Sequence, residues 1–554
     1  MTPFVNIWLN TASSDSPAPQ MKAREIIYRG LAVFESLYFA LLYIVPPFKK
    51  YNTFQLLNYD YGLYYQATYL LSRFQSLYLT TCGLHLWLAH QIYFSILLAP
   101  LHYLPVPHYF LLMAYSFGIW ACGLFCMIFF WRSNKSLSLL VPLVVWLSPF
   151  MVNMNLDIYH VESFATIFLL LTFLACLKGW KKSFYLFLIL AISCKEDVAI
   201  TAGFFLLLAL CRPKFFQLSR REFGCGLALC VSLFLFSETL IVPYYRLKTC
   251  QWLDRGFSAH LTGPSPAVPW FTSSHWFANI YQDLRTPSFY KEHFLSREAG
   301  RYLLLLFWPV FLFLEGSFPF CLLPLPGALI NMVGVVYMFQ GYWHYDHSTF
   351  AAVMITVLIG LEKTRWKKSL SLILAAITVV ISLKFPRVRV RPMELFSRPF
   401  WRMEKVPEVR FLETLRKRLP RDVVVSADYN SLNYLLEGHE NVYMFPNPLE
   451  KNYFGIYGLC EDPVSLPKPD LVILRSGWKI DVRTQALLKG SYEHQRIHDN
   501  DTSAEFDVYL LSRSSFHDRL NSIFQTFERS PPECFLTCAI PNGGFELPEE
   551  TLPL

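Results

Sequence analysis

Long apolar segments that recur along most of the chain constrain its fold more than any other feature. A helix that crosses a bilayer needs about 20 predominantly apolar residues, and on that template we count about eleven spans between residues 30 and 385. Of the 554 residues, 54% are hydrophobic and only 16% are charged, against roughly 25% charged residues in soluble globular domains. The sequence therefore predicts an α-helical, polytopic membrane protein.

Basic residues between the apolar segments predict the orientation. Lys22, Arg24 and Arg29 precede the first apolar segment, at about 30–47, so residues 1–29 are expected in the cytoplasm. Residues 87–104 allow two interpretations, because this segment either spans the membrane or dips along its outer face. We take the dipping interpretation, since it puts every later basic turn inside. The further spans are then expected at about 109–131, 136–154, 163–177, 183–194, 198–211, 224–243, 302–316, 319–339, 348–362 and 369–385.

The composition changes after the last apolar segment. Short β-branched or aromatic runs at 422–427, 441–445, 470–474 and 506–511 are separated by Pro, Gly, Asn and Asp, while 409–419 has helical spacing. Such a pattern is typical of a soluble α/β domain. We therefore predict three parts, which are a cytoplasmic N-terminal segment (1–29), a transmembrane domain (30–385) and an external soluble α/β domain (386–554).

Charge and cysteine usage exclude two other kinds of site. The formal net charge of +8 comes from small basic clusters between apolar segments, which is the pattern of orientation signals, so no nucleic-acid partner is expected. The 13 cysteines are mostly single residues inside apolar runs, with no CxxC and no zinc-like spacing. They are interpreted as small core residues.

Ionisable residues close to the predicted spans gather on the outer side. A charged group near hydrocarbon costs roughly 2.5 to 3.5 kcal/mol, so such residues usually line a cavity or pair with each other. The alternative is that Asp60 caps an interfacial helix and that the other groups solvate their own turns. The residues concerned are Asp60, His85 and His90 in the first outer loop, Asp157, His160 and Glu162, then Lys195, Glu196 and Asp197, and finally His344, Tyr345, Asp346 and His347.

The aromatic stretch at 58–66 contains one carboxylate, Asp60, which is the predicted reactive group. Chemistry at a membrane face suits a polyprenyl phosphate sugar, whose tail stays in the bilayer. Lys195 or a protonated His90 would hold the phosphate, while Asp60 accepts a proton from the attacking hydroxyl. A single base on the opposite face would invert the anomeric carbon. Divalent metals bind residue types such as His344, Asp346 and His347, but the spacing here defines no specific metal site.

The run Tyr59–Gln66 resembles the FDLGIFDQ signature of a bacterial multispanning membrane family, domain of unknown function 2079. Further matches occur in the family's order, namely His90 with 98–101, His160 with Glu162, the run 195–199, and His344 with Tyr345. That family resembles the GT-C glycosyltransferases, polytopic enzymes that use lipid phosphate sugars and carry an essential acidic residue in the first outer loop.

The resemblance implies that Asp60 is the catalytic residue and that interfacial helices lie in the first outer loop. Two departures from the pattern leave dependence on a divalent metal open, because Tyr65 replaces the second acidic residue of the signature and Asp60 lacks an acidic neighbour. The predicted substrate-binding residues are Gln66, His90, His160, Glu162, Lys195, Glu196, Asp197, His344 and Tyr345.

The sequence thus predicts a GT-C-type membrane glycosyltransferase that transfers a sugar from a polyprenyl phosphate donor to a glycan, lipid or protein acceptor. We expect it in a bacterial inner membrane, with its N-terminus cytoplasmic and its C-terminal domain periplasmic. A transporter or flippase of lipid-linked sugars is one alternative, and it requires polar groups along a path to both faces. A non-catalytic envelope assembly protein is another, and it would tolerate the loss of Asp60.

Overall fold

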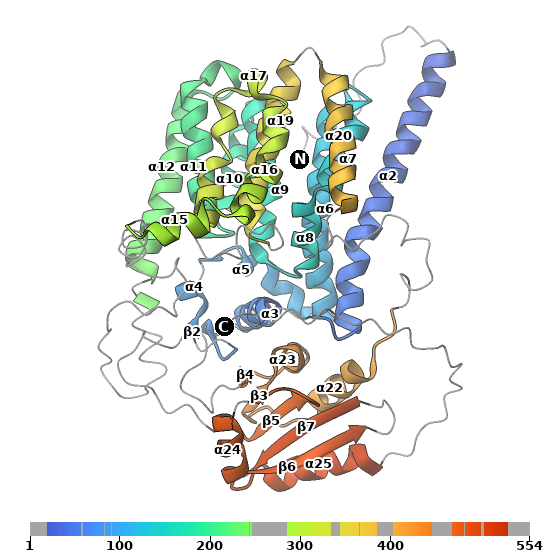
Figure 1. The fold of residues 1–554 in the computed structure, drawn as a ribbon, viewed down its shortest axis with the longest axis vertical. Helices are drawn as coiled ribbons and strands as arrows, with labels where there is room; N and C mark the ends of the chain where they lie inside the picture. The colour runs from blue at the N-terminus through green and yellow to red at the C-terminus, as the bar shows by residue number, and fades with distance from the viewer. Residues whose placement is uncertain are drawn as a thin grey trace.

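The structure is a computed structural model that describes most of the chain between Pro19 and Arg529. The described part runs over 19–529 except 57–58, 82–83, 90, 243, 246–284, 334–343, 365, 385–400, 402, 446–467, 481 and 500–503. Helices that stand side by side make up its larger part, and a small sheet lies beyond one end of them (Figure 1).

Most of the longer described helices form a bundle, which Figure 1 shows with its helices side by side. Apolar residues on several faces of these helices are buried against neighbouring helices in one continuous core. In chain order they are α2 (Pro19–Asn52), α6 (Pro107–Trp131), α7 (Leu137–Leu147), α8 (Pro149–Leu156), α9 (Phe164–Lys178), α10 (Lys181–Ile192), α11 (Glu196–Cys211), α12 (Arg220–Phe236), α16 (Arg297–Phe311), α18 (Leu325–Val333), α19 (His347–Lys363) and α20 (Lys367–Lys384).

Fewer helices than predicted are long and apolar enough to cross a membrane. Among the described residues four meet that requirement, namely Ala23–Asn52, Pro107–Trp131, Val161–Lys178 and Arg220–Ile241, and α7 with α8 makes a fifth if this pair, bent by 51°, counts as one span. The predicted number of eleven spans is therefore not confirmed. Helices do form in the predicted places, but many are short: α10 has 12 residues and α11 has 16, against the roughly 20 that a full span needs.

The segment 87–104 is not one long helix in its described residues. It contains α4 (Leu86–Ala89), α5 (Ser95–Leu98) and the 3₁₀ helix Ala99–Tyr103. Before it lie α3 (Tyr59–Ser72) and the hairpin of β1 (Tyr78–Leu79) with β2 (Leu84–His85). Figure 1 shows α3 between the helix bundle and the C-terminal sheet. This arrangement agrees with the prediction of short helices in the first loop, while their depth in a bilayer stays a prediction.

The C-terminal residues form a five-stranded sheet in the order β4-β3-β5-β7-β6. Strand β3 (Val425–Ala427) is parallel to β4 (Val442–Met444) and to β5 (Leu471–Arg475), whereas β7 (Ala504–Leu511) is antiparallel to β5 and to β6 (Tyr492–Asp499). All four strands predicted from the sequence are confirmed, and β6 was not predicted. The helices around this sheet are α22 (Pro407–Arg418), which confirms the helical spacing at 409–419, α23 (Tyr429–Leu435), α24 (Val482–Ser491) and α25 (His517–Arg529).

Two ends of the bundle can be told apart by their turns. At the end away from the sheet, the backbone NH of Gln217 bonds to the carbonyl of Cys176 at 3.1 Å, and Lys363 Nζ lies 4.7 Å from the ring centroid of Phe215. The turns after α9, α11 and α19 therefore meet there. At the other end, α3 packs against α23 of the sheet layer (Figure 1). The residues predicted inside and those predicted outside thus lie at opposite ends, while which end faces the cytoplasm stays a prediction.

Candidate functional site

Asp60 lies in the first turn of α3, at the bundle end that faces the sheet. Its side chain is 33% exposed, and its Oδ2 lies 3.7 Å from Nε2 of His160, which is fully buried. The structure therefore brings together two predicted site residues that are separated by 100 positions in the chain. Asp60 is at the edge of the group, where its side chain is partly exposed.

The break between α8 and α9 supplies the middle of the site. After α8 ends at Leu156, Tyr159 has a left-handed backbone with φ of 64°, which is uncommon for a residue other than glycine. His160 follows, and the 3₁₀ turn Val161–Ser163 leads into α9. This route places Asp157 Oδ2 at 3.6 Å from Nε2 of His160 and Glu162 Oε1 at 3.6 Å from its Nδ1.

The environment of His160 favours its charged form. Burial lowers the pKa of this imidazole, but the carboxylates of Asp157, Glu162 and Asp60 outweigh burial, so the pKa is raised above its usual value. Opposite charges at this range stabilise an imidazolium. A protonated His160 places a positive charge within 4 Å of all three carboxylates, including that of Asp60.

Lys195 lies at a second helix break, between α10 and α11, as the extended residue that precedes α11. Its Nζ is 3.5 Å from Glu162 Oε1, an oxygen that also accepts a hydrogen bond from the Tyr64 hydroxyl at 3.2 Å. The Lys195 side chain is only 3% exposed. Its ammonium is thus directed at Glu162 inside the protein, and a contact between Lys195 and a phosphate stays a prediction.

The acidic residues after Lys195 bind groups from two other segments. Asp197 Oδ2 lies 3.4 Å from Nε2 of the buried His347, and Glu196 Oε2 accepts the backbone NH of Gln91 at 3.2 Å. The ring of Tyr345 is 5.6 Å from Lys195 Nζ, within the range of a cation–π contact. Glu196, Asp197 and Tyr345 therefore adjoin the Lys195 and Glu162 pair, while substrate binding by these residues stays a prediction.

A buried carboxyl precedes α19. Asp346 Oδ1 accepts hydrogen bonds from the Tyr302 hydroxyl at 2.6 Å and from Asn331 Nδ2 at 3.0 Å. Burial raises the pKa of Asp346 to about 7. Within the described residues no group of three or more His, Cys, Asp or Glu side chains is arranged to hold a metal ion.

Some predicted residues are not brought into this group. Gln66 is directed at the C-terminal layer, since its Nε2 donates to Thr80 Oγ1 at 2.7 Å and to the carbonyl of Glu440 at 3.2 Å. His85 stacks on Tyr245 with ring centroids 3.7 Å apart. His90 and the side chain of His344 lie outside the described residues. Substrate binding by Gln66, His90 and His344 stays a prediction.

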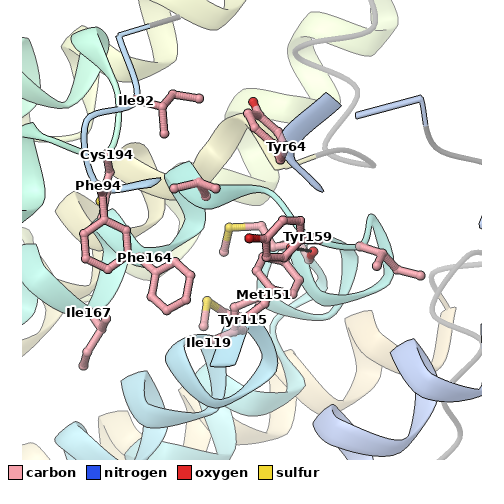
Figure 2. Close-up of a cluster of buried hydrophobic side chains, with 14 of the residues drawn as sticks. Tyr64, Ile92, Phe94, Tyr115, Ile119, Met151, Tyr159, Phe164, Ile167 and Cys194 are labelled. Carbon is pink, nitrogen blue, oxygen red and sulfur yellow. Dashed lines mark hydrogen bonds between the residues drawn. The ribbon is translucent and has the colours of Figure 1, made fainter. Parts of the chain in front are cut away.

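Lys50 and Tyr64 belong to the site although they were not singled out from the sequence. Lys50, near the end of α2, donates from Nζ to the carbonyl of Leu156 at 2.6 Å, next to Asp157. In the sequence this lysine follows the first apolar segment together with Lys49. Figure 2 shows Tyr64 and Tyr159 among buried apolar side chains such as Phe94 and Phe164. Water is excluded from such surroundings, and electrostatic interactions are stronger there than in bulk water.

A predominantly helical chain, with helices long and apolar enough to cross a membrane and with paired charges buried at one end, is the architecture of an integral membrane protein. A family model described as "Predicted membrane protein (DUF2079)" matches residues 50–499. The chain belongs to this family.

No curated protein matches the chain. Among solved structures, it is similar to ArnT from Cupriavidus metallidurans bound to undecaprenyl phosphate, with a TM-score of 0.46, 10% sequence identity, and coverage of 89% of this chain and 98% of that one. At this score and identity the likeness carries no functional conclusion.

Proposed function

We propose that the protein is a membrane glycosyltransferase that transfers a sugar from a polyprenyl phosphate donor to an acceptor hydroxyl, with Asp60 as general base. The observation that carries the proposal is the position of Asp60. This carboxylate is one-third exposed, and its other side meets the buried His160. A general base needs both access to the substrate and a fixed orientation.

In the proposed reaction, the acceptor hydroxyl gives its proton to Asp60 while its oxygen forms a bond to the anomeric carbon. The bond from that carbon to the phosphate oxygen breaks, and the electron pair leaves with the polyprenyl phosphate. One base on the face opposite to the leaving group gives inversion at the anomeric carbon. The protein ends the cycle with a proton on Asp60, which is released to solvent on its exposed side.

The buried groups support Asp60 by fixing its neighbours. His160 lies between three carboxylates, and Glu162 is held by both Lys195 and Tyr64. Each charge in this arrangement has an opposite charge within 4 Å, so little rearrangement is needed when charge moves in the reaction. In this proposal Lys195 holds Glu162 in place, in addition to any contact with the donor.

A small apolar pocket lies between helices of the bundle. It lies between α7, α8, α16, α19 and α20, and it is lined almost entirely by apolar side chains, among them Val144, Phe150, Leu306, Phe350 and Met354. Phe150 is also next to Tyr302, the ring that donates to Asp346. The pocket thus adjoins the helix ends that carry the charged groups, so apolar side chains lie close to the proposed reaction site.

A deletion strain tests the proposal. Its glycans and glycolipids are compared with those of the parent, and the strain is complemented with the wild-type chain or with Asp60→Asn at matched membrane levels. We expect one glycan or glycolipid to disappear and its unglycosylated acceptor to accumulate. The wild type should restore the product and Asp60→Asn should not. Full restoration by Asp60→Asn would reject Asp60 as the base, and an unchanged glycan profile would reject the transferase.

A further inference from the structure

The helix α3 has contacts of two different kinds on its two sides. Asp60 faces His160 in the bundle. Gly62 and Gln66 are four residues apart and therefore share a face of the helix, and both contact the C-terminal layer. The catalytic role proposed for Asp60 does not account for these two residues.

Gly62 is required by close packing against α23. A Cβ at this position would lie 2.6 Å from Asn433 Oδ1 and 2.6 Å from Leu432 Cδ2. These atoms are not free to retreat, because Leu432 is fully buried and the Asn433 amide donates to the carbonyl of Leu56 at 3.2 Å. Any side chain at Gly62 would push α3 and α23 apart.

Gln66 and Thr80 bind the chain at and before the edge strand of the sheet. Gln66 Nε2 donates to the carbonyl of Glu440, and Thr80 Oγ1 lies 2.7 Å from that carbonyl and 2.8 Å from the carbonyl of Val442 in β4. Since β4 is the outermost strand, one of its edge carbonyls is occupied by the first loop. A slip of the sheet along α3 would break these bonds.

The chain before α3 is held by the same layer. The hydroxyl of Tyr434 in α23 donates to the carbonyl of Tyr51 at 2.6 Å, and the backbone NH of Val406 donates to the carbonyl of Asn52 at 2.9 Å. The layer therefore contacts the end of α2, the following turn and α3 itself.

We propose that the C-terminal sheet layer is a positioning element of the site, which acts through α23 and β4 to fix α3 and so sets the place of Asp60 relative to His160. The inference rests on the proposed role of Asp60. Gly62, Gln66 and Thr80 are positioning residues, and none of them needs to touch the substrate. A displacement of about 1 Å in a reacting group costs as much as 100-fold in rate, so a modest shift of α3 is enough to lower turnover.

The test uses the full chain with substitutions on both sides of the contact. Gly62→Ala introduces the colliding methyl group, and Leu432→Ala with Asn433→Ala removes its neighbours. Gly224→Ala is the matched control, because a Cβ there meets nothing within 4 Å. Thr80→Val removes the hydroxyl that bonds to the edge strand, and its control is Thr414→Val, whose hydroxyl donates to the carbonyl of Arg410 within α22.

Two readouts are measured in each background. The first is sugar transfer from a polyprenyl phosphate carrying a labelled hexose, with kcat and KM determined separately. The second does not depend on activity. A cysteine replaces Asp60, and its rate of reaction with N-ethylmaleimide is followed by peptide mass spectrometry, with the exposed native Cys211 and Cys225 as references.

We expect Gly62→Ala to lower kcat about 10- to 100-fold with little change in KM, to change the labelling rate at position 60 several-fold, and to recover when Leu432 and Asn433 are alanine. Thr80→Val should do the same to a smaller extent, and both controls should match the wild type. An unchanged labelling rate with Gly62→Ala would overturn the inference, whatever happens to kcat. A changed labelling rate with unchanged kcat would support the inference that the C-terminal layer positions α3, and it would reject Asp60 as the base.

Discussion

The two ends of the helix bundle differ in how far their charged side chains are exposed. At the end away from the sheet, basic residues such as Lys178, Lys182, Arg212 and Lys363 are exposed. At the end beside α3, charged residues such as His160, Glu162 and Lys195 are buried and lie within 4 Å of opposite charges. Exposed basic turns suffice to orient a chain in a membrane, whereas burying charges is expensive and usually marks a functional site.

The comparison also bears on the flippase alternative. A carrier that moves a charged lipid headgroup across the bilayer needs polar groups along a path to both faces. In the described part of the chain, the buried charge network lies at one end, and the pocket between the helices is apolar. This distribution favours chemistry at one face, and the following predictions test it.

The largest expected effect is all-or-none, and it concerns orientation. Single cysteines at Lys182 and at Asp518, which is fully exposed on α25, should react with a membrane-impermeant thiol reagent from opposite sides of sealed vesicles. Position 518 should react from the periplasmic side and position 182 only after the membrane is opened. Reaction of both positions from one side would contradict the two-ended arrangement, and the reverse pattern would invert the orientation.

Asp60→Asn should lower kcat by about 10² to 10⁴, because the amide keeps the size of the carboxyl but cannot take a proton. Sugar transfer by purified protein is the measurement. Lys182→Gln, which neutralises an exposed charge at the opposite end, is the control and should keep the wild-type rate. If both variants transfer sugar equally fast, the end with the buried charged residues is not the catalytic end.

Glu162→Ala should destabilise the protein by about 3 to 5 kcal/mol, because it leaves the buried Lys195 and His160 without their shared carboxylate. Unfolding in detergent by heat or denaturant measures the loss. Adding Lys195→Met should restore part of it, since the second unpaired charge is then removed. Lys363→Gln, at the opposite end, loses only an exposed cation–π contact, worth about 0.5 to 1 kcal/mol. Equal losses of stability in Glu162→Ala and Lys363→Gln would contradict the difference between the two ends of the bundle.

The smallest expected effect is a pH dependence of stability. The folded pKa of His160 is raised by neighbouring carboxylates, so the stability it contributes is fully present below about pH 6.5 and is lost as pH rises through the folded pKa. Unfolding between pH 6 and 9 should show this loss, and His160→Gln should flatten the curve. Stability that rises with pH in this window would show that the imidazole is neutral in the folded protein.

The contribution of Asp346 to stability is distinguished from that of His160 by the pH range in which it changes. Burial raises the pKa of Asp346 to about 7, so folding favours its protonated form, and its contribution is lost mainly between about pH 4 and pH 7. Asp346→Asn should remove the pH dependence in that lower range only. The two variants together therefore assign each part of the curve to one side chain.

Local patterns sufficed to predict much of the fold but not all of it. The buried strands have continuous apolar or β-branched runs, and each was found. Strand β6 was missed because, among its residues with described side chains, only Tyr492 and Ile497 are buried, and two apolar residues five positions apart do not alternate. The number of spans is not confirmed among the described residues, because apolar composition does not show where a helix ends or bends, as α7 does at Ser148 before Pro149.

In the site, too, local sequence patterns indicate some contacts between distant residues and miss others. Glu162 and Lys195 were grouped because charges beside apolar segments tend to meet, and they do. The contact between Gln66 and Glu440 joins residues 374 positions apart, and no local pattern indicates it. Lys50 was overlooked for the same reason, since its bond to the carbonyl of Leu156 joins residues 106 positions apart.

The pairing of Asp197 with His347 has a consequence for how the chain is made. His347 follows Asp197 by 150 residues, so at 5 to 20 residues per second a ribosome needs roughly 8 to 30 seconds to deliver the histidine after the carboxylate. During that interval α11 has already emerged without the partner from α19. The early helices therefore have to wait in a partly assembled form, and a chain that stops before residue 347 should be recognised as unfinished by membrane quality control.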